Sequence, residues 1–197
     1  MTTTIDRDPS NGYEAAALEF VARRERSFIG VATVRAWSRS RRPGAAILDL
    51  GCGHGVPISA ALLDDGFDVY GIDASPTLTS LFRNRFPHAH VACEAVEDSD
   101  FFGRKFDGII AVGLMFLLPA EVQGRLIRRV AQALESGGRF LFTSPEEACA
   151  WQDVVTGRQS VSMGAEAYRD CLSDSGLVLA GQYLDEGQNH YYDSHKR

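Results

Sequence analysis

Glycines alternate with other residues from Gly51 to Gly55, directly after the mostly apolar run Ile47–Leu50. A second apolar run, Val69 to Ile72, ends in Asp73, which lies 18 residues after Gly55. Glycine lets the backbone approach a ligand closely, and a carboxylate at the end of the following strand commonly accepts hydrogen bonds from ribose hydroxyls. The two features predict a site for a ligand that contains a ribose. The alternative is a tight turn that binds nothing.

The spacing and one neighbouring charge narrow the class of ligand. The glycines follow the pattern G-x-G-x-G, whereas a nicotinamide-binding loop has G-x-G-x-x-G. Asp49 stands two residues before the first glycine. A carboxylate there would repel a pyrophosphate and attract an ammonium group. The pattern therefore disfavours a dehydrogenase and favours a ligand that has an ammonium group and no phosphate, as S-adenosylmethionine does.

These residues need a sheet that brings the ends of several strands together. The pattern of apolar residues predicts strands that alternate with helices. The strands are expected at about 46–50, 67–72, 89–93, 107–112 and 138–143, and the helices at about 55–65, 75–85 and 119–135. Such alternation is typical of parallel sheets covered on both faces. After a polar stretch from 144 to 162, the sequence predicts a helix at about 165–175 and two strands, 177–184 and 190–192, whose short connection makes them antiparallel.

The predicted fold is therefore α/β, a Rossmann-like, doubly wound sheet of seven strands. It is mostly parallel with an antiparallel C-terminal hairpin, and helices lie on both faces. Two helices are expected before the first strand, one opening at 11 or 12 and one at about 29–38, followed by a linker at 38–44. We expect residues 1–44 to form an N-terminal helical cap and residues 45–197 to form the ligand-binding domain.

Composition sets further bounds. The chain has 197 residues, 45% of them hydrophobic, and a net charge of −6, which disfavours binding to nucleic acid or to an anionic membrane. We find no apolar run of membrane-spanning length, and Met1–Thr4 does not open a signal peptide. The four cysteines lack C-x-x-C spacing, and no histidine cluster has metal-ligand spacing, so we expect reduced thiols, a cytoplasmic location and no metal. Nothing indicates the oligomeric state.

Taken in their order along the chain, these motifs resemble those of the class I S-adenosylmethionine-dependent methyltransferases. The first motif of that family is similar to Ile47–Gly55, and the acidic end of its second strand is similar to Asp73. Its later motifs are similar to three further segments, Cys93–Glu97, Phe106–Ile110 and the Gly-Gly crossing Leu134–Phe142. The resemblance implies methyl transfer from S-adenosylmethionine to a small-molecule acceptor. The alternative is a non-catalytic module that binds S-adenosylmethionine or S-adenosylhomocysteine and acts through partners.

The resemblance also implies the residues that contact the cofactor. Backbone of the glycine loop would face the methionyl group and ribose, with Asp49 near the ammonium group and Asp73 accepting from both ribose hydroxyls. Glu94 would accept from the adenine amino group, although the adenine contact could lie anywhere from Glu94 to Glu97. The full set of expected cofactor residues is Asp49, Gly51, Cys52, Gly53, Asp73, Ala74, Glu94, Ala95, Val96 and Val112.

The acceptor side departs from the family pattern. Leu117 stands where many relatives have a histidine, and no Asn/Asp-Pro-Pro-Tyr/Phe motif follows the fourth strand, which argues against methylation of exocyclic amines in nucleic acids. No catalytic base is identified. His190, beside two tyrosines on the last strand, is the candidate, with strand packing as the alternative. The residues expected to define the acceptor pocket are Tyr13, Trp151, Tyr168 and His190.

Overall fold

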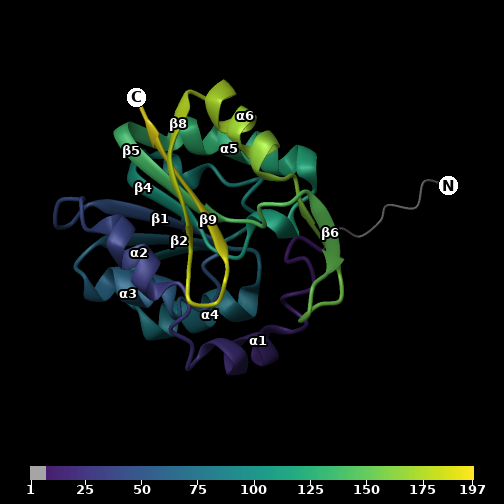
Figure 1. The fold of residues 1–197 in the computed structure, drawn as a ribbon. Coiled ribbons are helices and arrows are strands. Elements are labelled where there is room, and N and C mark those ends of the chain that lie inside the picture. The colour runs from purple at the N-terminus through teal and green to yellow at the C-terminus, as the bar shows by residue number, and fades with distance from the viewer. Residues whose placement is uncertain (1–7) are drawn as a thin grey trace.

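The computed structural model describes residues 8–197, so the expectation for Met1–Thr4 lies outside the described residues. Its main feature is a seven-stranded sheet in the order β3-β2-β1-β4-β5-β9-β8 (Figure 1). The strands are β1 Ala46–Leu50, β2 Asp68–Asp73, β3 His90–Cys93, β4 Phe106–Ala111, β5 Leu134–Thr143, β8 Leu177–Leu184 and β9 His190–Lys196. β1 to β5 are parallel, and β9 runs antiparallel to both β5 and β8. The predicted fold class is confirmed.

Helices cover both faces of this sheet. They are α1 Ala17–Arg24, α2 Val31–Ser38, α3 Ile58–Asp64, α4 Pro76–Arg85, α5 Ala120–Ala133 and α6 Ala165–Asp174. In β1, Leu48 belongs to a core that includes buried residues of α5 and α6, and Ile47 belongs to a second core with residues of α2 and α3. Successive side chains of a strand point to opposite faces, so each neighbouring apolar residue serves a different core.

Two predicted helices differ from the structure at their ends. α5 has buried apolar residues at every fourth position, Val122, Leu126 and Val130, but it ends at Ala133, two residues before the predicted end, where β5 begins. α3 begins at Ile58, three residues later than predicted. The delay arises because the glycine loop continues through positive-φ backbone, which suits glycine and does not continue into a helix.

A two-stranded antiparallel hairpin, which the sequence did not predict, lies within the polar stretch 144–162. It consists of β6 Cys149–Gln152 and β7 Gln159–Ser162. The ring of Trp151 on β6 packs 5.3 Å from that of Phe116, in the short 3₁₀ helix η2 Met115–Leu117 that follows β4. The hairpin therefore covers the end of the sheet at which β4 finishes (Figure 1).

The N-terminal segment 8–16 is fixed by its own polar side chains. α1 begins only at Ala17, because residues 8–16 form turns in which Asp8 accepts hydrogen bonds from the Ser10 and Gly12 amides. The carboxylate of Glu14 accepts from the Thr77 amide at 3.1 Å and from its hydroxyl at 2.7 Å, at the start of α4. The segment therefore lies against the carboxyl ends of the strands. The division between residues 44 and 45 stays a prediction.

Candidate functional site

The order of the strands creates a crevice at one edge of the sheet. β1 lies between β2 and β4, so the chain, after adding β3 outside β2, returns to the other side of β1 to form β4. At such a reversal the loops after the two central strands diverge and leave a crevice at the carboxyl ends, which is where open α/β sheets bind ligands. Here these loops begin with Gly51 after β1 and Val112-Gly113 after β4.

A cavity of about 270 Å³ occupies this crevice. Its floor comes from the strand ends, and its cover comes from the N-terminal segment, α1 and the β6–β7 hairpin. Seven residues expected from the sequence line it, namely Tyr13, Gly51, Gly53, Asp73, Ala74, Val96 and Val112. An apolar wall follows β4, made by Leu114, Phe116, Leu117 and Leu118.

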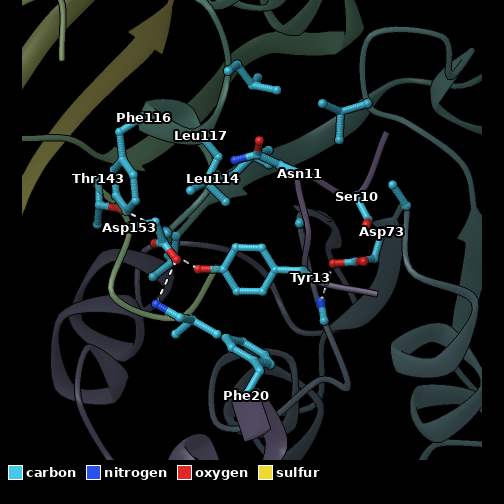
Figure 2. A pocket seen from close by; sticks show the side chains of 18 of the residues that line it. Ser10, Asn11, Tyr13, Phe20, Asp73, Leu114, Phe116, Leu117, Thr143 and Asp153 are labelled. Carbon is cyan, nitrogen blue, oxygen red and sulfur yellow. Dashed lines mark hydrogen bonds between the residues drawn. The ribbon is translucent and has the colours of Figure 1, made fainter. Parts of the chain in front are cut away.

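Asp73 is held at the end of β2 by two backbone amides. Its Oδ2 accepts a hydrogen bond from Gly53 N at 2.9 Å, and its Oδ1 accepts from Ser75 N at 2.8 Å. Burial raises the pKa of Asp73, while the amides of Ser75 and Gly53 oppose that shift. Each carboxylate oxygen retains a lone pair, so the group is a fixed double acceptor beside the glycine loop (Figure 2).

The loop after β3 supplies another part of the lining. The sequence left the contact open between Glu94 and Glu97, and in the structure Val96 and Glu97 line the cavity, whereas Glu94 and Ala95 are not among the lining residues. Arg129 of α5 donates hydrogen bonds to the carbonyls of Val96 and Glu97, each at 2.8 Å. This arginine fixes the backbone of the loop.

Two further expected residues do not line the cavity. The Asp49 carboxylate is buried and accepts a 2.5 Å hydrogen bond from the Ser59 hydroxyl of α3. Burial raises the pKa of Asp49 to about 7, although Ser59 opposes the shift. The Cys52 thiol packs against Gly71 of β2, where an added Cβ would lie 2.7 Å from the sulfur. Their roles toward a ligand stay predictions.

Arg24, at the end of α1, lines the cavity, and the sequence did not single it out. Burial lowers the pKa of Arg24, and the nearby groups that oppose this shift include Tyr191 and Asp185. Among residues 8–197, no carboxylate forms an ion pair with its guanidinium. Arg24 is also the one positively charged side chain in the described lining. A guanidinium in this position suits an anionic group on a ligand.

Tyr13 and Asp153 cover the cavity together. The Tyr13 hydroxyl donates a 3.1 Å hydrogen bond to Oδ2 of Asp153, a residue of the hairpin loop. In Figure 2 this hydroxyl points toward Asp153 and away from Asp73. Burial raises the pKa of Tyr13 and the Asp153 charge raises it further, so the phenol is a neutral donor at physiological pH. The sequence did not predict Asp153 as a site residue.

The other acceptor candidates lie outside the described lining. Trp151 packs on Phe116, a lining residue. Tyr168 is fully buried, and its hydroxyl donates to Gln123 Oε1 at 2.5 Å, as a core residue would. The ring of His190 packs edge-on to that of Tyr192 at 4.7 Å. The neighbours of His190 on either side, Asn189 and Tyr191, line the cavity instead.

Within residues 8–197 the structure has no group of three or more His, Cys, Asp or Glu side chains that could hold a metal ion. In the same part of the chain, every helix is too short or too polar to cross a membrane.

Known proteins share both the motifs and the fold. A family model described as "Methyltransferase domain" matches residues 47–138, from β1 to the start of β5. The chain has a TM-score of 0.70, at 20% identity, with a TehB-like SAM-dependent methyltransferase from Corynebacterium glutamicum, and the match covers 95% of this chain and 97% of that one. The family model and the structural match together support the resemblance to the class I S-adenosylmethionine-dependent methyltransferases that the sequence shows. The predicted fold is confirmed.

Two other matches are named as an N-terminal methyltransferase and an N1-methyltransferase. The "Cypemycin N-terminal methyltransferase" of Streptomyces sp. is 39% identical over 123 residues, which make up 57% of this chain and 48% of that protein. The 1,6-didemethyltoxoflavin-N1-methyltransferase of Burkholderia thailandensis, whose structure holds S-adenosylhomocysteine, has a TM-score of 0.70 at 18% identity, covering 95% of this chain and 90% of that one. The chain spans about half the length of this curated relative.

Proposed function

We propose that this protein transfers the methyl group of S-adenosylmethionine to a small-molecule acceptor. The observation that carries the proposal is the pairing of Asp73 with the glycine loop. Its carboxylate is hydrogen-bonded to the Gly53 amide at 2.9 Å, and both residues line one cavity at the carboxyl ends of the strands. A fixed carboxylate suits the ribose hydroxyls of the cofactor, since it accepts two hydrogen bonds from adjacent donors.

The residues around this pair fit the rest of the cofactor. Gly51 and Gly53 have φ values of 71° and 56°, so the loop needs glycine and presents bare backbone to the methionyl group. Gly113 has φ 81°, and a Cβ built on it would meet open space, so a ligand can approach the end of β4 closely. Val96 and Glu97 would flank the adenine.

Arg24 extends the expected set of cofactor residues. We infer that its guanidinium binds the methionyl carboxylate, because it lines the same cavity as Gly51 and Gly53 and forms no ion pair with any carboxylate of residues 8–197. A partly buried guanidinium that pairs with a ligand carboxylate recovers part of its desolvation cost. The expected roles of Asp49 and Glu94 remain as derived from the resemblance.

When bound, the cofactor supplies a methyl group on a sulfonium, which is already a good leaving group. The protein therefore has to align the acceptor and exclude water, and positioning alone lowers a barrier by several kcal/mol. The apolar wall after β4 and the cover made by Tyr13 and the hairpin loop serve this purpose. The limited cover suits a small acceptor, and the relative that methylates a cypemycin N-terminus is consistent with an amine.

The free cysteines of the described chain are consistent with a cytoplasmic location, which we also propose. The proposed function is tested by two measurements on the purified protein. Calorimetry should detect binding of S-adenosylhomocysteine, and incubation with methyl-labelled S-adenosylmethionine and candidate acceptors should transfer the label. Binding without transfer to any acceptor in a broad panel would favour the non-catalytic module, and no binding would overturn both readings.

A further inference from the structure

We propose that Asp153 binds the acceptor directly and that the atom methylated is an amine nitrogen. The inference rests on the proposed methyl transfer and names the class of acceptor.

The hairpin loop holds the Asp153 side chain in one orientation. Oδ1 accepts hydrogen bonds from Val155 N at 2.9 Å, from Thr156 N at 2.8 Å and from Thr156 Oγ1 at 3.2 Å. The backbone closes the same turn, since Asp153 N donates to the Arg158 carbonyl at 2.7 Å. The carboxylate is therefore in place before any ligand arrives, and binding requires no rearrangement of this group.

The second oxygen lacks a charge partner within the described chain. Oδ2 accepts a single hydrogen bond from described residues, from Tyr13, and the Asp153 side chain is buried with only 8% exposure. No lysine, arginine or histidine among residues 8–197 pairs with it, because the nearby Arg158 pairs with Asp8 at 2.9 Å instead. A buried carboxylate without a cation is costly. A cationic group on the ligand would offset that cost.

The surroundings of Asp153 indicate what carries this cation. Apolar residues from η2, the residue after it and the hairpin loop line the cavity with Asp153, namely Phe116, Leu117, Leu118, Val154 and Val155. Asp73 lies on the far side of the Tyr13 ring in Figure 2, with the glycine loop assigned to the cofactor. The charged group beside this apolar wall is thus one fixed carboxylate, and the lining also includes the neutral polar side chains of Asn11 and Thr143. It suits a compound with an apolar body and an amine.

The chemistry of methyl transfer favours the same class. The bound ammonium first releases a proton to water, which frees a lone pair on nitrogen. That lone pair forms the new N–C bond while the C–S bond breaks, and the electron pair of the C–S bond returns to sulfur. The positive charge moves from the sulfonium to the nitrogen, so an adjacent carboxylate stabilises the charge that develops there. The resulting N-methylammonium releases a proton to water. A phenolate or carboxylate acceptor would be repelled by Asp153.

The test compares matched compounds in the presence of S-adenosylhomocysteine. The probes are 2-phenylethylamine, 2-phenylethanol and phenylacetate, with the corresponding benzyl and pentyl series, and their binding is measured by ligand-observed NMR and calorimetry. We expect the wild-type protein to bind amines more tightly than the matching alcohols, and carboxylates least.

Three variants separate charge from structure. Asp153→Asn keeps an oxygen for the three donors to Oδ1 and replaces Oδ2 by an uncharged donor. We expect its amine affinity to fall at least about tenfold, as loss of a charged hydrogen bond predicts, with alcohol affinity unchanged. Tyr13→Phe keeps the carboxylate and should keep the amine preference. Asp174→Asn removes an exposed carboxylate from α6 and should behave as wild type.

The amine assignment is overturned if the wild type prefers alcohols or carboxylates, if it binds no probe, or if Asp153→Asn retains the amine preference in a folded protein. Calorimetry with S-adenosylhomocysteine alone keeps the two proposals apart. Absence of that binding contradicts the proposed function, whereas binding without an amine preference contradicts only the role of Asp153.

Discussion

Tyr13 and Asp153 lie 140 positions apart in the chain, yet the phenol of one donates a 3.1 Å hydrogen bond to the carboxylate of the other. This bond joins the N-terminal segment to the β6–β7 hairpin above the cavity. A second link runs alongside it, the ion pair between Asp8 and Arg158. Two segments that the strand pattern does not predict together form the cover of the site.

The first prediction concerns this cover. Tyr13→Phe removes the hydrogen bond but keeps the edge-on ring contact with Phe20 at 5.4 Å. We expect the free energy of unfolding to fall by about 1–3 kcal/mol, because Asp153 loses its donor on Oδ2. Hydrogen exchange should become faster in segment 8–16 and remain unchanged in α5. Equal protection of segment 8–16 in both proteins would show that the bond does not hold the cover.

The second prediction concerns Arg24. If its guanidinium binds the methionyl carboxylate, Arg24→Gln should lower the affinity for S-adenosylhomocysteine by roughly tenfold or more, since a charged hydrogen bond is lost. Methylthioadenosine lacks the amino-acid end of the cofactor, so its affinity should not change. Calorimetry with both ligands measures this difference. Equal weakening of the two would mean that Arg24 acts through the fold and not through the carboxylate.

The third prediction is a pH dependence of stability. The pKa of Asp49 in the fold is about 7, above the value of about 3.9 for an unfolded aspartate, so the native state binds this proton more tightly. The contribution of Asp49 to stability therefore falls as pH rises from about 4 to 7. Asp49→Asn keeps a partner for Ser59 and removes the titration.

Urea denaturation of both proteins at pH 5 and pH 8 measures this contribution. Between pH 5 and pH 8, the free energy of unfolding of Asp49→Asn should rise relative to that of the wild type by more than about 1 kcal/mol, which corresponds to roughly one pKa unit. Taking the difference removes the effects of other groups, including Asp73. A constant difference between the proteins would refute the raised pKa.

The fourth prediction concerns selectivity. S-adenosylhomocysteine should raise the melting temperature, because a ligand that binds only the folded state stabilises it by mass action. NADH should not raise it, since the G-x-G-x-G spacing differs from the G-x-G-x-x-G spacing of nicotinamide-binding loops. A shift with NADH alone would contradict the cofactor assignment.

The strand and helix order could be predicted because the signals are local. Two such signals are the apolar run Val69–Ile72 and the apolar residues at every fourth position from Val122 to Val130. Both depend only on neighbours in the chain. The glycine loop and Asp73 likewise follow from their positions at strand ends. The hairpin β6–β7 could not be predicted, because many of its residues are polar and its packing on Phe116 is a tertiary contact.

Most of the acceptor side escaped prediction for the same reason, although Tyr13 was expected there and lines the cavity. The conspicuous aromatic residues of the late chain include Tyr168, which the fold uses as a buried core residue. Asp153 looks like an ordinary turn residue, because Asp and Gly, which are common in turns, bracket the segment Asp-Val-Val-Thr-Gly. Its hydrogen bond to Tyr13, a residue of the N-terminal segment, is a tertiary contact that the local sequence does not reveal.

The central claim is that Asp73 holds the ribose of S-adenosylmethionine, and calorimetry with Asp73→Ala tests it most directly. Asp170→Asn, an exposed substitution on α6, serves as the matched control, and circular dichroism checks that both variants are folded. We expect Asp73→Ala to lower the affinity for S-adenosylhomocysteine by at least about tenfold, since two hydrogen bonds to a charged acceptor are lost. The affinity of the control should equal that of the wild type. Unchanged affinity in a folded Asp73→Ala protein would contradict it.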